Sequence, residues 1–279
     1  MKLTVLVDNN SIIDRYFLAE PGLCFLLETE YKKVLFDLGY SDIFIKNAQK
    51  MKMDLTKIDT VVFSHGHNDH TGGLPHLISL YIEEALEKRG CIKPELICHR
   101  NTFNTKIIDD FIDIGTLIKE EKLNLHFNMK LTNEPLWITA NLVYLGEIPR
   151  VTQFENKVPV GRVMEDNILK DDYLLDDSAL VYKSKDGLVI ITGCSHAGIC
   201  NIIERAKAVC CDNRILDIIG GFHLLNPSKT QLDGTIEYFQ KLNLRSIYAS
   251  HCTDLSSKIA LSEFFDIKEV GVGLELEYL

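Results

Sequence analysis

Short apolar runs rich in Val, Ile and Leu recur along the chain, and many are followed by segments whose apolar residues have helical spacing. Between residues 199 and 209, apolar residues recur every three or four positions, which predicts an amphipathic helix. The same spacing predicts helices over 42–51, 77–88, 230–242 and 256–265. Strands are predicted over 3–7, 24–28, 34–37, 60–64, 95–98, 179–182, 188–192, 215–219 and 246–250.

The order of these elements predicts an α/β fold. An early series of strands is followed by strands that alternate with helices, which indicates a sheet-rich core with helices on its outer faces. No repeat or Pro/Gly/Ser-rich linker divides the chain, so we expect a single domain over residues 1–279. Two stretches, at about 101–135 and 155–177, fit the alternation poorly, and we interpret them as insertions that form a lid or cap. The acidic run over 165–177 is interpreted as a solvated surface loop.

Composition narrows the class of protein and its partners. The 279 residues are 46% hydrophobic and 25% charged, as in soluble globular proteins. Thirty Lys and Arg against forty Asp and Glu give a net charge of −10, which argues against long nucleic acid as a partner. No apolar run is long enough for a membrane span or a signal peptide, so we expect a cytoplasmic protein. The eight cysteines contain no C-x-x-C spacing and are expected to be reduced.

The segment from Ser64 to Gly73 carries the clearest chemical signal. It reads Ser-His-Gly-His-Asn-Asp-His-Thr-Gly-Gly and follows a predicted strand, so that four potential metal ligands fall within six residues. On a strand His65 and His67 would share one face, while Asp69 and His70 lie where the following loop can turn back. This arrangement suits two adjacent metal ions. Imidazole and carboxylate donors favour zinc in the first place, with Mn, Fe or Ni as alternatives.

Three further histidines each follow a predicted strand. His196 comes after 188–192, His223 after 215–219 and His251 after 246–250. Strand ends on one edge of a sheet meet in space, so we expect these side chains to approach the first motif. His99, after the strand 95–98, is a further candidate for lining the pocket.

The H-x-H-x-D-H motif, preceded by Leu-Phe-Asp-Leu-Gly at 35–39, resembles that of the metallo-β-lactamase-fold hydrolases. The resemblance implies a four-layer αβ/βα sandwich with the metals at one edge between two sheets. Longer matches resemble one branch of this family and lie at 19–23, 146–150, 177–180, 193–199 and 220–224. The archaeal members of that branch are described as dihydropterin–ribofuranosylaminobenzene-phosphate synthases, and its bacterial members are mostly called uncharacterised metal-dependent hydrolases.

The resemblance also implies a ligand set, in which one metal has His65, His67 and His196 and the other has Asp69, His70 and His251. Asp37 would orient a histidine ligand through its far ring nitrogen. The family usually has a metal-bridging aspartate at the position of Cys194, which is therefore a possible ligand or near neighbour of the metals. Pro21 stands where this branch is expected to have a histidine.

These residues predict a metal-dependent hydrolase with two metal ions that acts on a small anionic ester such as a phosphodiester. A metal pair can generate hydroxide near neutral pH, with Asp69 orienting it and His223 and Arg150 as candidates for binding substrate or donating a proton. The alternative is a synthase-like transferase, as the archaeal relatives suggest. An oxygen-reducing di-iron enzyme is disfavoured because His67 stands where such proteins typically have glutamate. A binding protein without catalysis would be expected to lack ligands of the motif.

Overall fold

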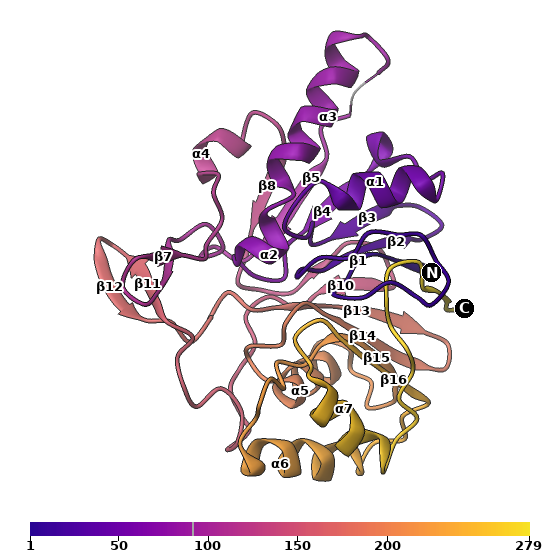
Figure 1. Cartoon of the computed structure of the whole chain (residues 1–279), viewed down its shortest axis with the longest axis vertical. Coiled ribbons are helices and arrows are strands. Elements are labelled where there is room, and N and C mark those ends of the chain that lie inside the picture. Colours follow the sequence, from indigo (N-terminus) through magenta and orange to yellow (C-terminus); the bar gives the residue numbers. More distant parts are fainter. Residues whose placement is uncertain (91) are drawn as a thin grey trace.

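Two β-sheets face one another in the middle of the molecule, and helices cover their outer sides (Figure 1). The structure is a computed structural model that describes residues 1–90 and 92–279, so Cys91 lies outside the described residues. The seven other cysteines are all free. No helix in the described part of the chain is both long and apolar enough to cross a membrane.

The first sheet is built mainly from the N-terminal half of the chain. Its strands β17, β1, β2 and β3 are antiparallel neighbours, whereas β3, β4, β5 and β8 are parallel. In order across the sheet they are β17 (Glu275–Glu277), β1 (Lys2–Val7), β2 (Cys24–Glu28), β3 (Lys33–Phe36), β4 (Thr60–Val62), β5 (Glu95–Cys98) and β8 (Asn128–Leu131).

The second sheet is built from the C-terminal half. Its strands β16, β15 and β14 are parallel, and β14, β13, β10 and β9 are antiparallel. In order they are β16 (Ser246–Ser250), β15 (Ile215–Gly221), β14 (Gly187–Thr192), β13 (Ala179–Ser184), β10 (Leu142–Tyr144) and β9 (Leu136–Trp137).

Both faces of the central strands are buried, which explains their continuous apolar runs. In β14, Leu188 and Ile190 pack toward the helices, whereas Val189 and Ile191 pack toward the first sheet. The core between the sheets thus receives every second residue of β14.

The helices form the outer layers of the sandwich. The first sheet is covered by α1 (Ile43–Lys50) and α3 (Leu74–Leu86), whose apolar residues join one core cluster with that sheet. The second sheet is covered by α5 (Ile199–Cys210), α6 (Lys229–Phe239) and α7 (Leu255–Ser262). Side chains of Ser228 and Asp254 cap α6 and α7 by accepting hydrogen bonds from backbone N–H groups of the first turn. Shorter helical segments are η1 (Leu55–Lys57), α2 (Asn68–Thr71) and α4 (Glu120–Leu123).

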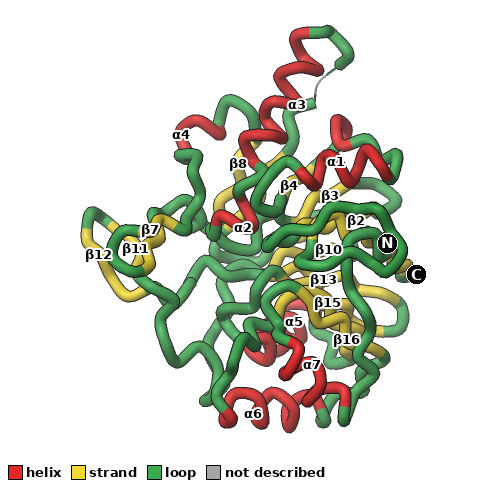
Figure 2. The backbone as a smooth tube through the Cα atoms, viewed as in Figure 1, coloured by secondary structure: helices red, strands yellow, loops and turns green. Residues whose placement is uncertain are grey.

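The stretches at about 101–135 and 155–177, which do not follow the strand–helix alternation, form strands that pair with each other. Strands β6 (Lys106–Ile108) and β7 (Ile112–Asp113) from one join β11 (Arg162–Glu165) and β12 (Ile168–Asp171) from the other in a third sheet. Figure 2 shows this sheet to one side of the sandwich, connected to it by loops. The boundary at 135 is too late, because β8 is an edge strand of the first sheet and Phe127 is in the core.

Every predicted strand and helix overlaps an observed one, and the α/β sandwich is confirmed. Several short strands have no counterpart among the predictions. The strands β6, β7, β11 and β12 of the third sheet are two to four residues long and have mixed or exposed burial patterns, so they lack the apolar runs on which the prediction depended.

Candidate metal centre

The H-x-H-x-D-H motif lies where the chain leaves β4. That strand ends at Val62, so His65 and His67 lie in a bend, and the expectation that they share a strand face is wrong. A Cβ atom on Gly66 would lie 2.0 Å from the carbonyl oxygen of Thr102, so this close approach requires glycine. The bend leads directly into α2, which carries Asp69 and His70. The bend and α2 thereby direct all four donors of the motif toward the same site.

Asp37, which follows β3, is buried beneath the motif. Its carboxylate accepts hydrogen bonds from the backbone N–H and the hydroxyl of Ser64, each at 2.7 Å. Its Oδ2 also lies 2.7 Å from Nδ1 of His70. This contact directs Nε2 of His70 into the site, as the orienting role expected for Asp37 requires.

The remaining donors come from the parallel strands of the second sheet. Cys194 and His196 lie in the loop after β14, and His251 directly follows β16. Nδ1 of His251 lies 3.1 Å from Oδ1 of Asn9, and its backbone N–H donates to Asp8 at 3.0 Å. The loop after β1 thus holds the histidine that the end of β16 supplies.

Left-handed backbone conformations gather around the site. Asp37, Ser195, His223 and His251 have φ values of 57°, 59°, 49° and 49°. Residues other than glycine rarely adopt such values, at a cost of about 1–3 kcal/mol each, and they persist where the surrounding structure enforces them. Each of these residues follows a strand, so each turn directs the chain sharply away from its sheet at the edge where the donors meet.

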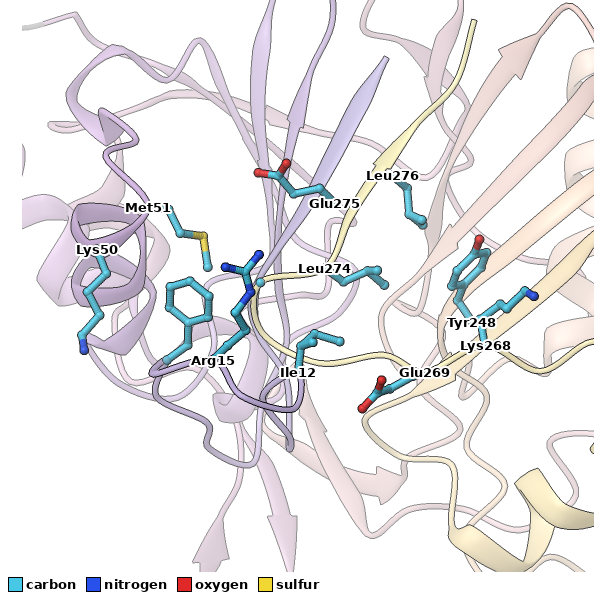
Figure 3. A pocket seen from close by; sticks show the side chains of 12 residues that line it. Ile12, Arg15, Lys50, Met51, Tyr248, Lys268, Glu269, Leu274, Glu275 and Leu276 are labelled. Carbon is cyan, nitrogen blue, oxygen red and sulfur yellow. The ribbon is translucent and has the colours of Figure 1, made fainter.

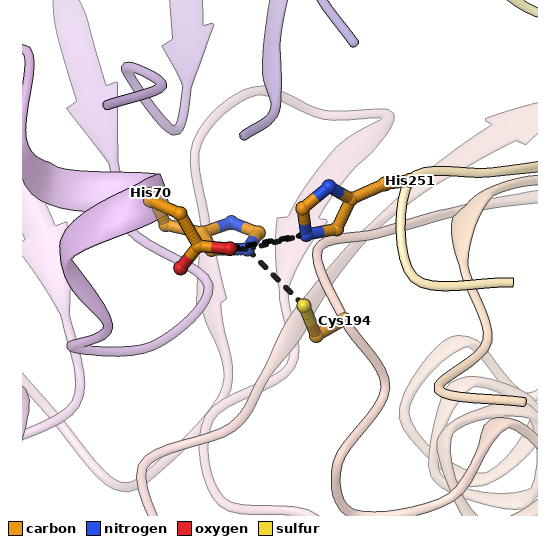
Figure 4. Close-up of side chains that lie close together, drawn as sticks. His70, Cys194 and His251 are labelled. Atoms are coloured by element: carbon orange, nitrogen blue, oxygen red, sulfur yellow. Dashed lines mark hydrogen bonds and ion pairs between the residues drawn. The ribbon is translucent and has the colours of Figure 1, made fainter. Parts of the chain in front are cut away.

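Asp69, His70, Cys194 and His251 form the group that we call the carboxylate set. Their potential ligand atoms all lie within 4.8 Å of one another. Nε2 of His70 is 3.1 Å from both Sγ of Cys194 and Nε2 of His251, and these side chains point toward one another (Figure 4). Oδ2 of Asp69 is 3.4 Å from Nε2 of His251.

His65, His67 and His196, together with the same Cys194, form the histidine set. Ligand atoms of His65, Cys194 and His196 lie within 4.8 Å of one another, and Nε2 of His65 is 3.1 Å from Nδ1 of His67. The ring centroids of His67 and His196 are 4.9 Å apart. The structure thus brings together all six predicted ligands and Cys194, whose sulfur belongs to both sets.

The donors fit a transition metal. Both ring nitrogens of the buried His196, and Nε2 of His67, have no hydrogen-bond partner among the described residues. Buried imidazole nitrogens are normally bonded, so each of these neutral rings has an unpartnered nitrogen whose electron pair can be given to a cation. Nitrogen, thiol and carboxylate donors are those that zinc and neighbouring transition metals prefer.

The two sets differ in electrostatics. Burial lowers the pKa values of His65 and His196 well below the usual value, and that of His67 to about 4, so these rings are neutral. Burial would also lower the pKa of His70, but the carboxylates of Asp69 and Asp37 raise it to about 9. Burial raises the pKa of the Cys194 thiol, which therefore keeps its proton unless a cation lies beside it.

A cavity of about 510 Å³ opens beside both donor sets. His223 lines it, with its ring centroid 4.2 Å from that of His196, and Pro21 and Tyr40 line it as well. The other wall comes from the third sheet and its connections, through Ile108, Ile114 and Val160. A neighbouring cavity of about 520 Å³ shares Val160, His196 and His223, and has polar side chains such as Lys157 and Asn226.

His223 does not belong to either group of converging ligand atoms. Its Nδ1 is buried without a hydrogen-bond partner in the described structure. Burial would lower its pKa, but contact with Cys252 and the charges of Asp177 and Asp69 raise it. A raised pKa increases the protonated fraction of this ring at neutral pH, as a proton donor requires.

A third cavity, of about 690 Å³, lies elsewhere on the molecule, beside β17 (Figure 3). Arg15, Lys50 and Lys268 are among its lining residues, and the figure shows them around the loop that leads into β17. None of the predicted site residues lines this cavity. Volume alone therefore does not identify the chemical centre.

Two predicted pocket residues lie elsewhere. Arg150 does not line the cavity beside the metal centre, and its guanidinium donates to the carbonyl oxygens of Ile148, Tyr173 and Leu174. Its two terminal nitrogens hold loops together away from this cavity, so the structure does not place Arg150 where the substrate-binding role would require it. His99 is buried, accepts a hydrogen bond from the backbone of Asn101 and does not line the cavity either.

The acidic run is not simply a solvated loop. Asp172, Asp176 and Asp177 are buried. Oδ1 of Asp176 accepts a hydrogen bond from the buried Lys106 at 2.8 Å, and its Oδ2 accepts one from the backbone N–H of Gly66 at 2.8 Å. This ion pair supports the bend of the metal motif. The pairing joins residues 70 positions apart, and no local sequence signal indicates it.

Comparison with known proteins agrees with this geometry. The model of the metallo-β-lactamase superfamily matches residues 18–86. An uncharacterised protein of Methanocaldococcus jannaschii is 29% identical over 97% of this chain and 98% of its own length. The 7,8-dihydropterin-6-methyl-4-(β-D-ribofuranosyl)-aminobenzene-5'-phosphate synthase of the same organism is 28% identical over 100% of this chain and 97% of its own.

Solved structures show the same fold. Tm1679, described as a metal-dependent hydrolase of the β-lactamase superfamily, has a TM-score of 0.83 and 29% identity, and the match covers 99% of this chain and 98% of that one. A diphosphatase of the PhnP family has a TM-score of 0.54 at 17% identity, with 100% and 98% coverage, and supports the fold alone. The matched motif region, the full-length relatives and the shared architecture show that the chain has the fold of the metallo-β-lactamase superfamily.

Proposed function

We propose that this protein is a metal-dependent hydrolase of the metallo-β-lactamase superfamily, with two adjacent metal ions, that cleaves a small anionic ester such as a phosphodiester. The observation that carries the proposal is the position of Cys194, whose sulfur lies within 4.8 Å of the donor atoms of the carboxylate set and of those of His65 and His196 in the histidine set. A shared anionic donor between two sets is what a pair of neighbouring cations needs, because it reduces their mutual repulsion.

In this proposal His65, His67 and His196 hold one ion and Asp69, His70 and His251 hold the other, with Cys194 between them. Zinc is the first expectation, and Mn, Fe or Ni are alternatives. When bound, the metals supply Lewis acidity that activates water and stabilises negative charge on the reacting ester. Asp37 fixes the ring of His70, and Asn9 fixes that of His251.

Two side chains take part in the reaction beyond binding metal. Asp69 is only partly buried, with a side-chain exposure of 30%, so its carboxylate reaches both the donors and the cavity. It orients the attacking water and accepts a proton from it. His223, on the other side of the cavity, donates a proton to the leaving oxygen.

A synthase-like transferase is the second candidate, because a relative with that name aligns with the whole of this chain. The same donors would then stabilise a leaving group while a second substrate, not water, attacks. The hydrolase remains the first proposal because Tm1679, which is described as a hydrolase, matches the structure at a TM-score of 0.83.

We further propose that residues 1–279 work as one metallo-β-lactamase-like domain in the cytoplasm on a small-molecule substrate. Residues from both central sheets supply the donors, which supports one functional unit. A reducing compartment would keep Cys194 available as a metal ligand.

Elemental analysis combined with a substrate screen tests these proposals. We expect the protein purified after metal-replete expression to carry up to two transition-metal ions per chain and to hydrolyse bis-p-nitrophenyl phosphate. The panel also contains lactones, thioesters and the pterin and aminobenzene precursors of the synthase product. Coupling of those precursors without hydrolysis would favour the transferase, and absence of any transition metal would refute both proposals.

A further inference from the structure

The cavity beside the metal centre has one polar wall and one apolar wall. The polar wall consists of donors from both sets, among them His67 and Asp69. The apolar wall presents the hydrocarbon side chains of Ile108, Ile114 and Val160, which come from the third sheet and its connections. No Lys or Arg occurs among the described residues that line this cavity. A charged group placed against the apolar wall would therefore lack a partner of opposite charge.

The apolar wall is attached to the metal motif itself. The backbone N–H of Asn68 donates to the carbonyl oxygen of Ile114 at 2.8 Å, and His67 forms a β-bridge with Gly115. Antiparallel pairing of β6 with β11 joins the two segments of the third sheet. The wall thus has a defined place relative to the metal donors.

The wall also leaves apolar surface uncovered. Ile108, Ile114 and Val160 are only partly buried, although they lie beside a cavity whose volume of about 510 Å³ is typical of small-molecule sites. The cavity on the other side of His223 has polar side chains such as Lys157 and Asn226. Of these two cavities, the one beside the third sheet therefore fits an apolar group of a substrate better.

We infer that the substrate carries an uncharged aryl or similarly hydrocarbon-rich group, which Ile108, Ile114 and Val160 bind while its anionic group lies at the metals. This inference rests on the proposed function, because it assigns the anionic part to the metal centre. The three side chains are then determinants of specificity, and burying their exposed surface favours substrates with this group.

Two phosphonates test the inference without requiring turnover. Phenylphosphonate and methylphosphonate present the same anionic group and differ in the hydrocarbon that they carry. We expect calorimetry on the zinc-loaded protein to show at least about tenfold tighter binding of phenylphosphonate, which corresponds to about 1.4 kcal/mol. Equal affinities would overturn the inference while leaving the metal site intact. Binding of neither compound would contradict the proposed metal centre instead.

Substitutions locate the effect on the wall. We expect Ile114→Ser, and separately Ile108→Ser, to reduce the preference for phenylphosphonate at least threefold and to leave methylphosphonate binding and zinc content unchanged. Ile112→Ser is the matched control, because Ile112 lies on β7 of the same sheet, is 39% exposed and does not line the cavity. A preference that survives both wall substitutions would place the aryl group elsewhere and overturn the assignment.

Discussion

The two donor sets share one sulfur atom but differ in how their other donors are held. In the carboxylate set, Nδ1 of His70 lies 2.7 Å from Asp37, and Nδ1 of His251 lies 3.1 Å from Asn9. In the histidine set, His196 has no hydrogen-bond partner at either ring nitrogen in the described structure. Hydrogen bonds at Nδ1 therefore fix the rings of the carboxylate set, whereas packing alone holds the ring of His196 in the histidine set.

Charge separates the sets further. Asp69 contributes a carboxylate to one set, whereas the other has three neutral imidazoles, which leaves Cys194 as its potential anionic donor. Because an anion attracts a divalent cation more strongly than a neutral ring does, we expect the carboxylate set to bind its ion more tightly. Adjacent metal sites built from one motif therefore need not fill equally, and variants of single donors test this difference.

The largest effect is expected for Cys194→Ala, which removes the donor that both sets share. Metal content should fall in both sites and turnover should be lost, as measured by elemental analysis after gel filtration and by ester hydrolysis. Cys194→Asp should retain metal, because a carboxylate can occupy the same position. Cys200→Ala, at a buried cysteine on α5, is the control for loss of a thiol from the core. Wild-type metal content in Cys194→Ala would make Cys194 a packing residue.

Substituting a donor of one set at a time shows whether the two sets bind their ions independently. His67→Ala should abolish turnover but keep about one metal per chain in the carboxylate set. Asp69→Asn should lower the occupancy of the carboxylate set and reduce the rate more than it reduces the stability of the fold, because the charge is lost at constant size. Metal content, turnover and thermal unfolding are measured together.

The control for these two variants is His76→Ala, since His76 is exposed on α3. If His67→Ala lost both ions while Asp69→Asn lost neither, the expected order of affinity would be reversed.

His223→Ala should leave both sets filled, because His223 is not among the converging ligand atoms. We expect the rate to fall by roughly 10²–10⁴-fold, as is typical for loss of a positioned general acid. The loss should be smaller for nitrophenyl esters, whose leaving group needs no proton. Loss of a full metal equivalent would make His223 a ligand.

The donor sets also differ in how far the sequence predicts them. His65, His67, Asp69 and His70 lie within six residues, so their pattern is visible without a structure. His196 and His251 are predictable as donors because each follows an apolar strand of a parallel arrangement, where strand ends meet. The order of strands in the second sheet, with β15 between β14 and β16, places His223 beside them as expected.

The parts that support the donors could not be predicted from local patterns. Asn9 contacts His251 from 242 positions away in the sequence, and Lys106 reaches Asp176 across 70. The third sheet consists of strands too short and too exposed for a hydrophobic period. Polar contacts between distant segments depend on the completed fold, and a single sequence carries no periodic signal for them.

The smallest effect is expected for Asp37→Asn, which acts on the carboxylate set through His70. Asp37 accepts hydrogen bonds from Ser64 and from the Nδ1–H group of His70, so that Nε2 is the nitrogen that releases its proton when a metal binds. The amide NH₂ of asparagine favours the opposite tautomer, with the proton on Nε2. We expect the affinity of that set to fall by about 10–100-fold, the usual range for loss of such a partner, while the histidine set keeps its ion. Competition with a chelator of known affinity measures both sites, and Asp42→Asn, at an exposed ion pair before α1, is the control. The hydroxyl of Ser64 also lies 2.9 Å from Nδ1 of His65, so Asp37 contacts both sets through Ser64 and His70. An equal loss of affinity from both sets would mean that Asp37 supports the whole motif and that the two metal sites are coupled.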